Sequence, residues 1–328
     1  MNFEHEYQSL FTAPDPAGTK RKAIDSPYLH RRQRRHFLLF DVAPFFGTLT
    51  AFASIPVIGF GWAEAGVLLV MWLITGFGIS VGYHRLLAHR SFKTSEAVKA
   101  AFAVAGSMAG QGGVISWVAM HRRHHECADK EGDVHSPQLH GAGFAGRFRG
   151  FVHAHFTWMA AHAYPNVAHY APDVLQSKRL VWISRNYYPI AFAGFIVPAM
   201  ACAAITQSLT GLLTGVLWGG MVRMFVLEQG IWSLNSFCHL WGRRDFSTRD
   251  HSRNIGWLAP FIFGESWHHN HHAFPGSAFF ALRWYRIDPG YWLIVLMKLA
   301  GLARDVKVPR RDQIDIRMTR TTARHDRI

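Results

Sequence analysis

Four stretches of the chain are long and apolar enough to cross a lipid bilayer, and they constrain its fold more than any other feature. They cover residues 37–59, 64–83, 188–206 and about 209–237. A membrane-spanning helix needs about 20 mostly apolar residues. Short links join the first stretch to the second and the third to the fourth. The sequence therefore predicts an all-α integral membrane protein with four transmembrane helices in two hairpins.

The fourth stretch is longer than a bilayer requires. At 1.5 Å per residue, a helix of its length extends about 45 Å, whereas the hydrocarbon core is about 30 Å thick. Its end should therefore project into water, and that end carries Asn235 and His239.

Basic residues flank the apolar stretches and account for much of the net charge of +14. They gather in residues 1–36 and 304–328, so we expect a basic cytosolic N-terminal tail, a membrane domain over 37–303 and a basic C-terminal tail. This segregation is typical of positive loops on the cytoplasmic side and not of a nucleic-acid-binding surface. The polar N-terminus has no signal-peptide core, and we expect a multi-pass protein of a bacterial inner membrane rather than of the endoplasmic reticulum.

Two further apolar stretches, 97–118 and 277–300, are ambiguous. The first has a glycine-rich centre, and it separates histidine clusters that must lie on one side of the membrane if they share a site. The second is interrupted by Arg283, Arg286 and Asp288. We predict that both lie in the membrane interface instead of crossing it.

Two histidine clusters repeat one spacing. HRRHH (121–125) and HHNHH (268–272) each place histidines at i, i+3 and i+4, which share one helix face. The members are His121, His124 and His125, then His268, His271 and His272. His269 lies about 100° around the helix from His268. We expect His269 to point away from any shared metal site, to solvent or to a neighbouring side chain.

A third cluster, HRLLAH (84–89), supplies His84 and His89 at i and i+5, which a regular helix cannot present on one face. They can join the others if the chain bends at the end of the second span. With His239 the candidates number nine, which suits two metal ions with four or five ligands each. Other metal sites fit less well. A structural zinc site usually contains cysteines, whereas the three cysteines of this chain form no CxxC pair. The second histidine of a zincin motif is missing after His125, and the site of a transporter would favour mid-membrane residues, not residues at the ends of the spans.

Acidic residues follow the HRRHH cluster in the segment HECADKEGDVHSP. Metal-bound histidines usually donate their second N–H to a carboxylate or a carbonyl. We therefore expect Asp129, Asp133 and His135 to support the ligands from behind, although a solvated loop with turn residues would give the same pattern.

The order HRLLAHR, HRRHH, NSFCH, HHNHH resembles the membrane fatty-acid desaturases of the acyl-CoA (stearoyl-CoA-like) delta-9 type. That family shows HxxxxH, HxxHH and [HQ]xxHH boxes and an NxxxH on the fourth span, here Asn235 and His239. The segment WVAMHRRHHECADKEGDVHSP also looks like the family's WxxxHRxHHxxxDxxxDxHS. The resemblance covers about residues 37–300.

The resemblance implies a cytosolic helical cap that holds two iron ions. The nine histidines would be direct ligands, and Asn235 would hold a water that ligates one iron. Such an enzyme uses O2 and two electrons to introduce a cis double bond into a long saturated acyl chain, commonly between carbons 9 and 10. The substrate has no polar group near those carbons, so an apolar tunnel must position it. We expect Trp72 and Trp117 to line that tunnel.

Several features leave alternatives open. Where the acyl-CoA enzymes carry an Arg-Asp pair that contacts CoA, this chain has Ala119 and Met120, so the carrier can be CoA or a lipid. The chain shows no cytochrome b5 haem motif and no dinucleotide fingerprint, so we expect a separate electron donor of the ferredoxin, flavoprotein or cytochrome b5 type. The basic residues near the histidines could dock an acidic donor; they are Arg85, Arg90, Arg122 and Arg123. A related di-iron hydroxylase, ketolase or alkane monooxygenase is the alternative activity.

Overall fold

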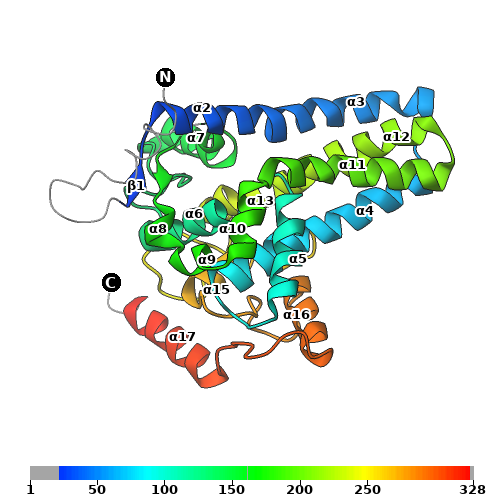
Figure 1. Ribbon diagram of the computed structural model, residues 1–328. Helices are drawn as coiled ribbons and strands as arrows, with labels where there is room; N and C mark the ends of the chain where they lie inside the picture. Colours follow the sequence, from blue (N-terminus) through cyan, green and yellow to red (C-terminus); the bar gives the residue numbers. More distant parts are fainter. Residues whose placement is uncertain (1–21, 161, 326–328) are drawn as a thin grey trace.

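The computed structural model describes residues 22–160 and 162–325, and it is predominantly helical (Figure 1). Four helices are long and apolar enough to span a membrane: Pro27–Ile58, Trp62–Ala88, Tyr187–Thr206 and Leu209–Leu240. Figure 1 shows the two hairpins projecting from one end of the molecule, while the other elements form a cap at the opposite end. The predicted architecture of four membrane helices with a helical cap is confirmed.

Three of the four spans contain a π-helical stretch. The first span consists of α2 (Pro27–Phe37), η1 (Leu38–Val42) and α3 (Ala43–Ile58), and the second of α4 (Trp62–Phe77) and η2 (Gly78–Ala88). The third is α11 (Tyr187–Thr206), and the fourth joins α12 (Leu209–Gly215), η4 (Val216–Val222), α13 (Arg223–Asn235) and α14 (Phe237–Leu240). The first span begins earlier than expected because the Ser26 hydroxyl accepts a hydrogen bond from the Leu29 amide and Pro27 starts the helix.

Buried polar contacts join the two hairpins at the end distant from the cap. Gly59 ends α3 in a left-handed conformation, with φ of 78°, which an L side chain rarely adopts. The Glu64 carboxylate then accepts hydrogen bonds from the Gly61 amide at 2.9 Å and from the Thr214 hydroxyl at 2.8 Å. Because Thr214 lies on the other hairpin, the Glu64 carboxylate links the two hairpins at this end.

The second hairpin packs closely along a stripe of glycines at four-residue spacing, Gly211, Gly215 and Gly219. A Cβ atom at Gly215 would lie 2.5 Å from the Pro198 carbonyl oxygen, and one at Gly219 would lie 2.3 Å from the Pro198 Cβ. Lipid tails are as apolar as leucine, so membrane helices associate mainly through such close packing. The glycines allow α12 and η4 to lie directly against α11.

The cap is assembled from short helices drawn from all remaining parts of the chain. They are α5 (Glu96–Ser107), α6 (Val114–Cys127), α7 (Gly143–His155), η3 (Thr157–Met159), α8 (Val167–Tyr170), α9 (Pro172–Leu175), α10 (Lys178–Arg185), η5 (Gly256–Leu258), α15 (His268–Ala273), α16 (Pro289–Leu299) and α17 (Arg311–His325). Two short strands, β1 (Ala23–Ile24) and β2 (Tyr164–Pro165), pair antiparallel. The ambiguous stretch 97–118 is divided between α5 and α6, and only α16 is helical within 277–300. Neither forms a fifth span among the described residues.

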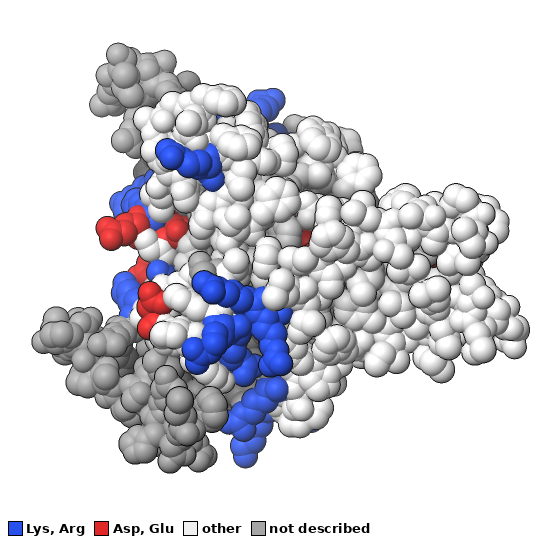
Figure 2. All heavy atoms as spheres, turned by 90° about the horizontal axis from the view of Figure 1, so that it is seen from above, with Lys and Arg blue, Asp and Glu red and all other residues white. Residues whose placement is uncertain are grey.

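Both basic terminal segments contribute folded elements to the cap side. The first supplies β1 and α2, and the last supplies α17, whose Ile314 is buried against Phe246, Ala273 and Leu282. On the face shown in Figure 2, charged side chains gather over the cap, whereas the projecting hairpins are almost free of them. This separation matches a bundle in lipid beneath a cap in water.

Candidate metal centre

Nine histidines converge where the cap meets the spans, and they come from four separate segments. His84 and His89 lie at the end of η2, three lie on α6, His239 lies on α14, and three lie on α15. They form two groups, and within each group one ligand atom per residue lies within 4.8 Å of every other. The groups are His84, His89, His121, His125 and His271, then His124, His239, His268 and His272.

A π-helix brings His84 and His89 together. The His89 amide donates to the His84 carbonyl at 3.0 Å, which is the i to i+5 hydrogen bond of a π-helix. Residues five apart therefore lie one turn apart, and the two ring centroids are 4.9 Å from each other. The chain adjusts its helical pitch where a bend had been expected.

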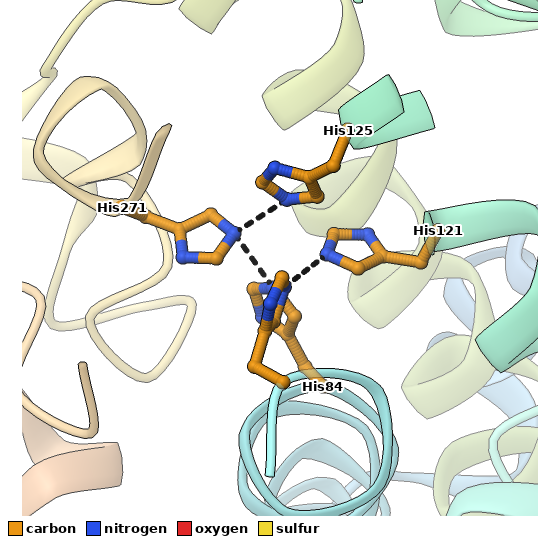
Figure 3. Close-up of side chains that lie close together, drawn as sticks. His84, His121, His125 and His271 are labelled. Atoms are coloured by element: carbon orange, nitrogen blue, oxygen red, sulfur yellow. Dashed lines mark hydrogen bonds between the residues drawn. The ribbon is translucent and has the colours of Figure 1, made fainter. Parts of the chain in front are cut away.

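In the first group the Nε2 atoms point at one another. The distances between Nε2 atoms are 2.7 Å for His89 and His121, 2.8 Å for His125 and His271, and 3.0 Å for His84 and His271. Figure 3 shows the rings of His84, His121, His125 and His271 turned inward around a common centre. Burial, followed by the neighbouring imidazoles, lowers the pKa of His121 and of His125 well below the ordinary value. Neutral imidazoles with converging lone pairs are what a metal cation requires.

The second group has the same arrangement. The Nε2 atoms of His239 and His268 are 3.0 Å apart. The Nε2 atoms of His124 and His272 are buried, and neither has a hydrogen-bond partner among the described residues. A buried nitrogen without a partner is costly, and a metal ion between these rings would remove that cost.

Carboxylates hold the outer nitrogens of four of these histidines. The Nδ1–H groups of His239, His124 and His272 donate to Asp129 at 2.8 Å, to Asp133 at 3.1 Å and to Asp250 at 3.2 Å, and that of His84 donates to Glu265. With Nδ1 protonated, each ring presents the Nε2 lone pair to the centre. Such contacts fix the tautomer and increase ligand basicity.

The pKa values of the three aspartates are lowered, so their carboxyl groups are ionised. Burial raises the pKa of Asp129, but the hydrogen bond and the charge of His239 outweigh it and leave the pKa well below the usual range. For Asp133, burial is opposed by the charges of His124 and His135, and the pKa is again strongly lowered. Asp250 follows the same pattern through His272. The carboxylates therefore offset positive charge at the centre.

The residues behind the ligands include three that the sequence pointed to and two carboxylates that it did not. Asp129, Asp133 and His135 all lie against the second group, where the His135 ring is 4.4 Å from that of His124. Asp250 and Glu265 were missed. Glu265 lies three residues before His268, which was an available signal. Asp250 lies in an irregular loop, and no pattern in the sequence marked it.

Of the other expected site residues, Asn235 and Trp117 lie beside the histidine groups, and Trp72 packs elsewhere on the second span. Asn235 ends α13 four residues before His239, is half-buried, and makes no side-chain hydrogen bond within residues 22–160 and 162–325. Trp117 stacks on His121 with ring centroids 5.2 Å apart, whereas Trp72 packs on Phe263 at 4.6 Å. Trp117 therefore touches a histidine of the first group.

The hypothesis that four arginines form a rim for a donor protein is wrong. Arg85 is fully buried and paired with Asp288 at 2.9 Å, and Arg123 is also buried. Arg122 donates to the backbone carbonyls of Ala88 and Leu87, which caps the end of η2. Arg90 alone is well exposed. Arg85, Arg122 and Arg123 therefore support the histidine segments from within.

His269 points away from both groups, as its helical position predicted. It is fully buried, its Nε2 lies 3.0 Å from the Phe246 backbone nitrogen, and its Nδ1 lies 3.1 Å from the Ser252 hydroxyl. That hydroxyl contacts Asp250, the partner of His272. His269 thus positions the loop that carries Asp250.

We expect His269→Ala to retain both metal ions while lowering stability by about 1–3 kcal/mol, since buried partners lose their hydrogen bonds. Metal analysis and thermal unfolding of the purified protein measure the two effects. Loss of one ion per chain would show that His269 is itself a ligand.

Comparison with known proteins agrees with this geometry. Residues 60–295 match the model of the fatty acid desaturase family. The chain is 45% identical over 303 residues to a hex-5-enoyl-[acyl-carrier protein] acetylenase of Moorena producens (strain JHB), covering 92% of this chain and 94% of the relative. It is 32% identical to Delta-9 acyl-lipid desaturase 1 of Arabidopsis thaliana, covering 93% and 97%. It is 33% identical to an sn-1 stearoyl-lipid 9-desaturase of Synechocystis sp. (strain ATCC 27184 / PCC 6803 / Kazusa), covering 76% and 74%.

Proposed function

The chain belongs to the fatty acid desaturase family, and on that premise we propose that it introduces a cis double bond, at carbon 9, into a long saturated acyl chain at two iron ions. The observation that carries the proposal is the pair of histidine groups with five and four converging nitrogen donors. Imidazole ligands suit iron, zinc, copper and nickel. Among these metals, iron fits an enzyme that must use O2 to oxidise an unactivated methylene.

The protein's own residues would have distinct roles in this reaction. Each histidine group would hold one ion, and Asn235 would place a water beside the second. Glu265, Asp129, Asp133 and Asp250 would keep the rings oriented, and iron would supply the oxidising power to remove hydrogen from the chain. Trp117, stacked on His121, would pack the acyl chain near the metal, and Trp72 would lie further along its path.

The acyl carrier we propose is a lipid or an acyl-carrier protein in place of CoA. The two positions where acyl-CoA enzymes have a charged pair are here a buried Ala119 and a partly buried Met120. The relatives named above are described as acting on acyl-lipids or on an acyl-carrier protein substrate.

We further propose that a separate protein donates the electrons. We also propose that the active site lies on the cytoplasmic face of a bacterial inner membrane, which agrees with the basic residues on the cap side.

Fatty-acid profiling of a host that expresses the chain tests the function directly. We expect products that have lost two hydrogens, and we expect an iron chelator to suppress them. Because a relative with 45% identity is named a hex-5-enoyl-[acyl-carrier protein] acetylenase, conversion of a double bond into a triple bond is the second candidate. It removes two further hydrogens, so its product has four fewer hydrogens than the saturated chain. A gain of oxygen would identify a hydroxylase and contradict the proposal.

A further inference from the structure

Two carboxylates lie buried inside the membrane spans, away from the histidines. Asp41 lies in the π-helical stretch η1 of the first span and is 5% exposed, and Glu228 lies in α13 of the fourth span and is fully buried. An ionisable residue inside a membrane is costly and generally functional. Local π-helical geometry is likewise frequent at functional positions.

Neither carboxylate is satisfied by the protein. All four carboxylate oxygens are buried, and none has a hydrogen-bond partner in the part of the chain that the structure describes. The nearby Arg223 donates instead to the backbone carbonyls of Gly219, Met108 and Gly194, at 3.2, 2.9 and 2.9 Å. A structural pair would be hydrogen-bonded, so these two groups have no evident packing role.

The two segments that carry these carboxylates, η1 of the first span and α13 of the fourth, lie against each other. Phe37, one turn before Asp41, packs against the cluster of Trp158, Met159 and Trp232, and Trp232 lies one turn after Glu228. The two helices run in opposite directions. Asp41 and Glu228 each lie one turn further from the cap than Phe37 and Trp232, and therefore at a similar depth in the bundle. Asp41 and Arg223 are the charged groups that act on Glu228. His155 of α7 packs against α13, where it contacts Gln229 and Ser236, and its ring centroid lies 6.2 Å from that of Trp232.

One face of the fourth span leads from Glu228 to the metal centre. Glu228, Trp232, Asn235 and His239 follow one another at four-, three- and four-residue intervals, which keeps them on one face. The eleven intervening steps cover about 16 Å. The indole nitrogen of Trp232 is buried without a partner among the described residues. Open acceptors at Glu228 and an open donor at Trp232 are groups that bound water satisfies.

On the first span, His36 lies a little over one turn before Asp41, toward the cap. The Nδ1 of His36 lies 3.8 Å from the Asp41 carboxylate, and its side chain is 13% exposed. Its Nε2 lies 2.8 Å from the Tyr187 hydroxyl. His36 is in the last turn of α2, beside the exposed Arg34 and Arg35. A partly exposed imidazole thus links the cytosolic end of the first span to the buried carboxylates.

We propose that Asp41 and Glu228 form an intramembrane proton-transfer site that passes protons from His36, along the Glu228–His239 face, to the metal centre. The proposal rests on the proposed function. Desaturation converts O2, two electrons, two protons and a –CH2–CH2– unit into –CH=CH– and two waters. The substrate supplies two of the four water hydrogens, and the electron-donor protein supplies the two electrons. The remaining two protons must reach a buried site from solvent, and a pair of carboxyls can relay them.

The test uses membranes of a host in which the wild-type chain makes unsaturated product. Glu228→Gln and Asp41→Asn should each slow turnover about tenfold or more, and the loss should deepen as pH rises because protons become scarcer. The solvent isotope effect in D2O should exceed that of the wild type. Metal content should be unchanged, and thermal stability should be equal or higher, since a buried carboxyl without a partner is removed. Glu228→Asp should recover a large part of the rate.

Glu64→Gln is the matched control, because Glu64 is also a buried carboxyl of the spans but has hydrogen bonds from Gly61 and Thr214. It should turn over at the wild-type rate. Wild-type rates for Glu228→Gln, or a loss that parallels lost metal or stability, would overturn the proposal. So would a dependence on added Na+ or Mg2+ that the variant abolishes, which would identify a cation site. Failure of the proposed function is distinct, since the wild type would then make no unsaturated product.

Discussion

Replacement of His268 by alanine is expected to remove one of the two metal ions and to reduce desaturation by more than about 100-fold. Loss of a partner that only supports a ligand typically costs 10–100-fold, and His268 would be a ligand itself. Its removal leaves His124, His239 and His272 with an incomplete set of donors. The metal content of the purified protein should fall from two ions per chain to about one.

The neighbouring His269 provides the matched control for this experiment. Both residues are buried histidines of α15, but only His268 belongs to a convergent group. Two ions retained in His269→Ala, and one in His268→Ala, would separate a ligand from a structural imidazole. Full activity in His268→Ala would remove it from the proposed ligand set.

The second large effect is on stability and concerns Arg85. We expect Arg85→Met to destabilise the protein by about 3–5 kcal/mol, because it leaves the buried carboxylates of Glu265 and Asp288 without their cation. The guanidinium also packs over the Phe280 ring, with 4.1 Å from Cζ to the ring centroid. Thermal unfolding in detergent measures the change, and activity should fall as well because Glu265 orients His84.

Arg90→Met is the control for Arg85. Arg90 pairs with Asp173 at 2.8 Å, but its side chain is 60% exposed, so solvent screens the pair. An exposed ion pair contributes about 0–1 kcal/mol. Equal destabilisation by the two substitutions would show that burial of Arg85 has no special consequence.

The spans and the histidine clusters could be predicted because their signals are local. Apolar runs of sufficient length identify membrane helices, and the i, i+3, i+4 spacing of His121, His124 and His125 defines a face without knowledge of the fold. The same spacing separated His269 from His268. The pairing of the clusters into one centre needed the further assumption that they lie on one side of the membrane.

The features that could not be predicted depend on contacts between distant segments. Asp250 reaches His272 from a loop without regular structure, and Glu265 reaches His84 across the cap. The prediction for the arginines was wrong because the local sequence around a basic residue beside a span does not reveal whether its side chain faces solvent or a buried carboxylate. The π-helix at His84 and His89 depends on how η2 packs against its neighbours, which spacing alone does not reveal.

The division of the nine histidines among four segments also determines when the centre can be completed during synthesis. The first group has four of its five members once residue 125 has emerged and lacks only His271. The second has His124 alone until His239 and then α15 follow, after both hairpins have been made. Its ion can therefore be loaded only after the whole bundle has entered the membrane, so metallation of this position would report that insertion is finished.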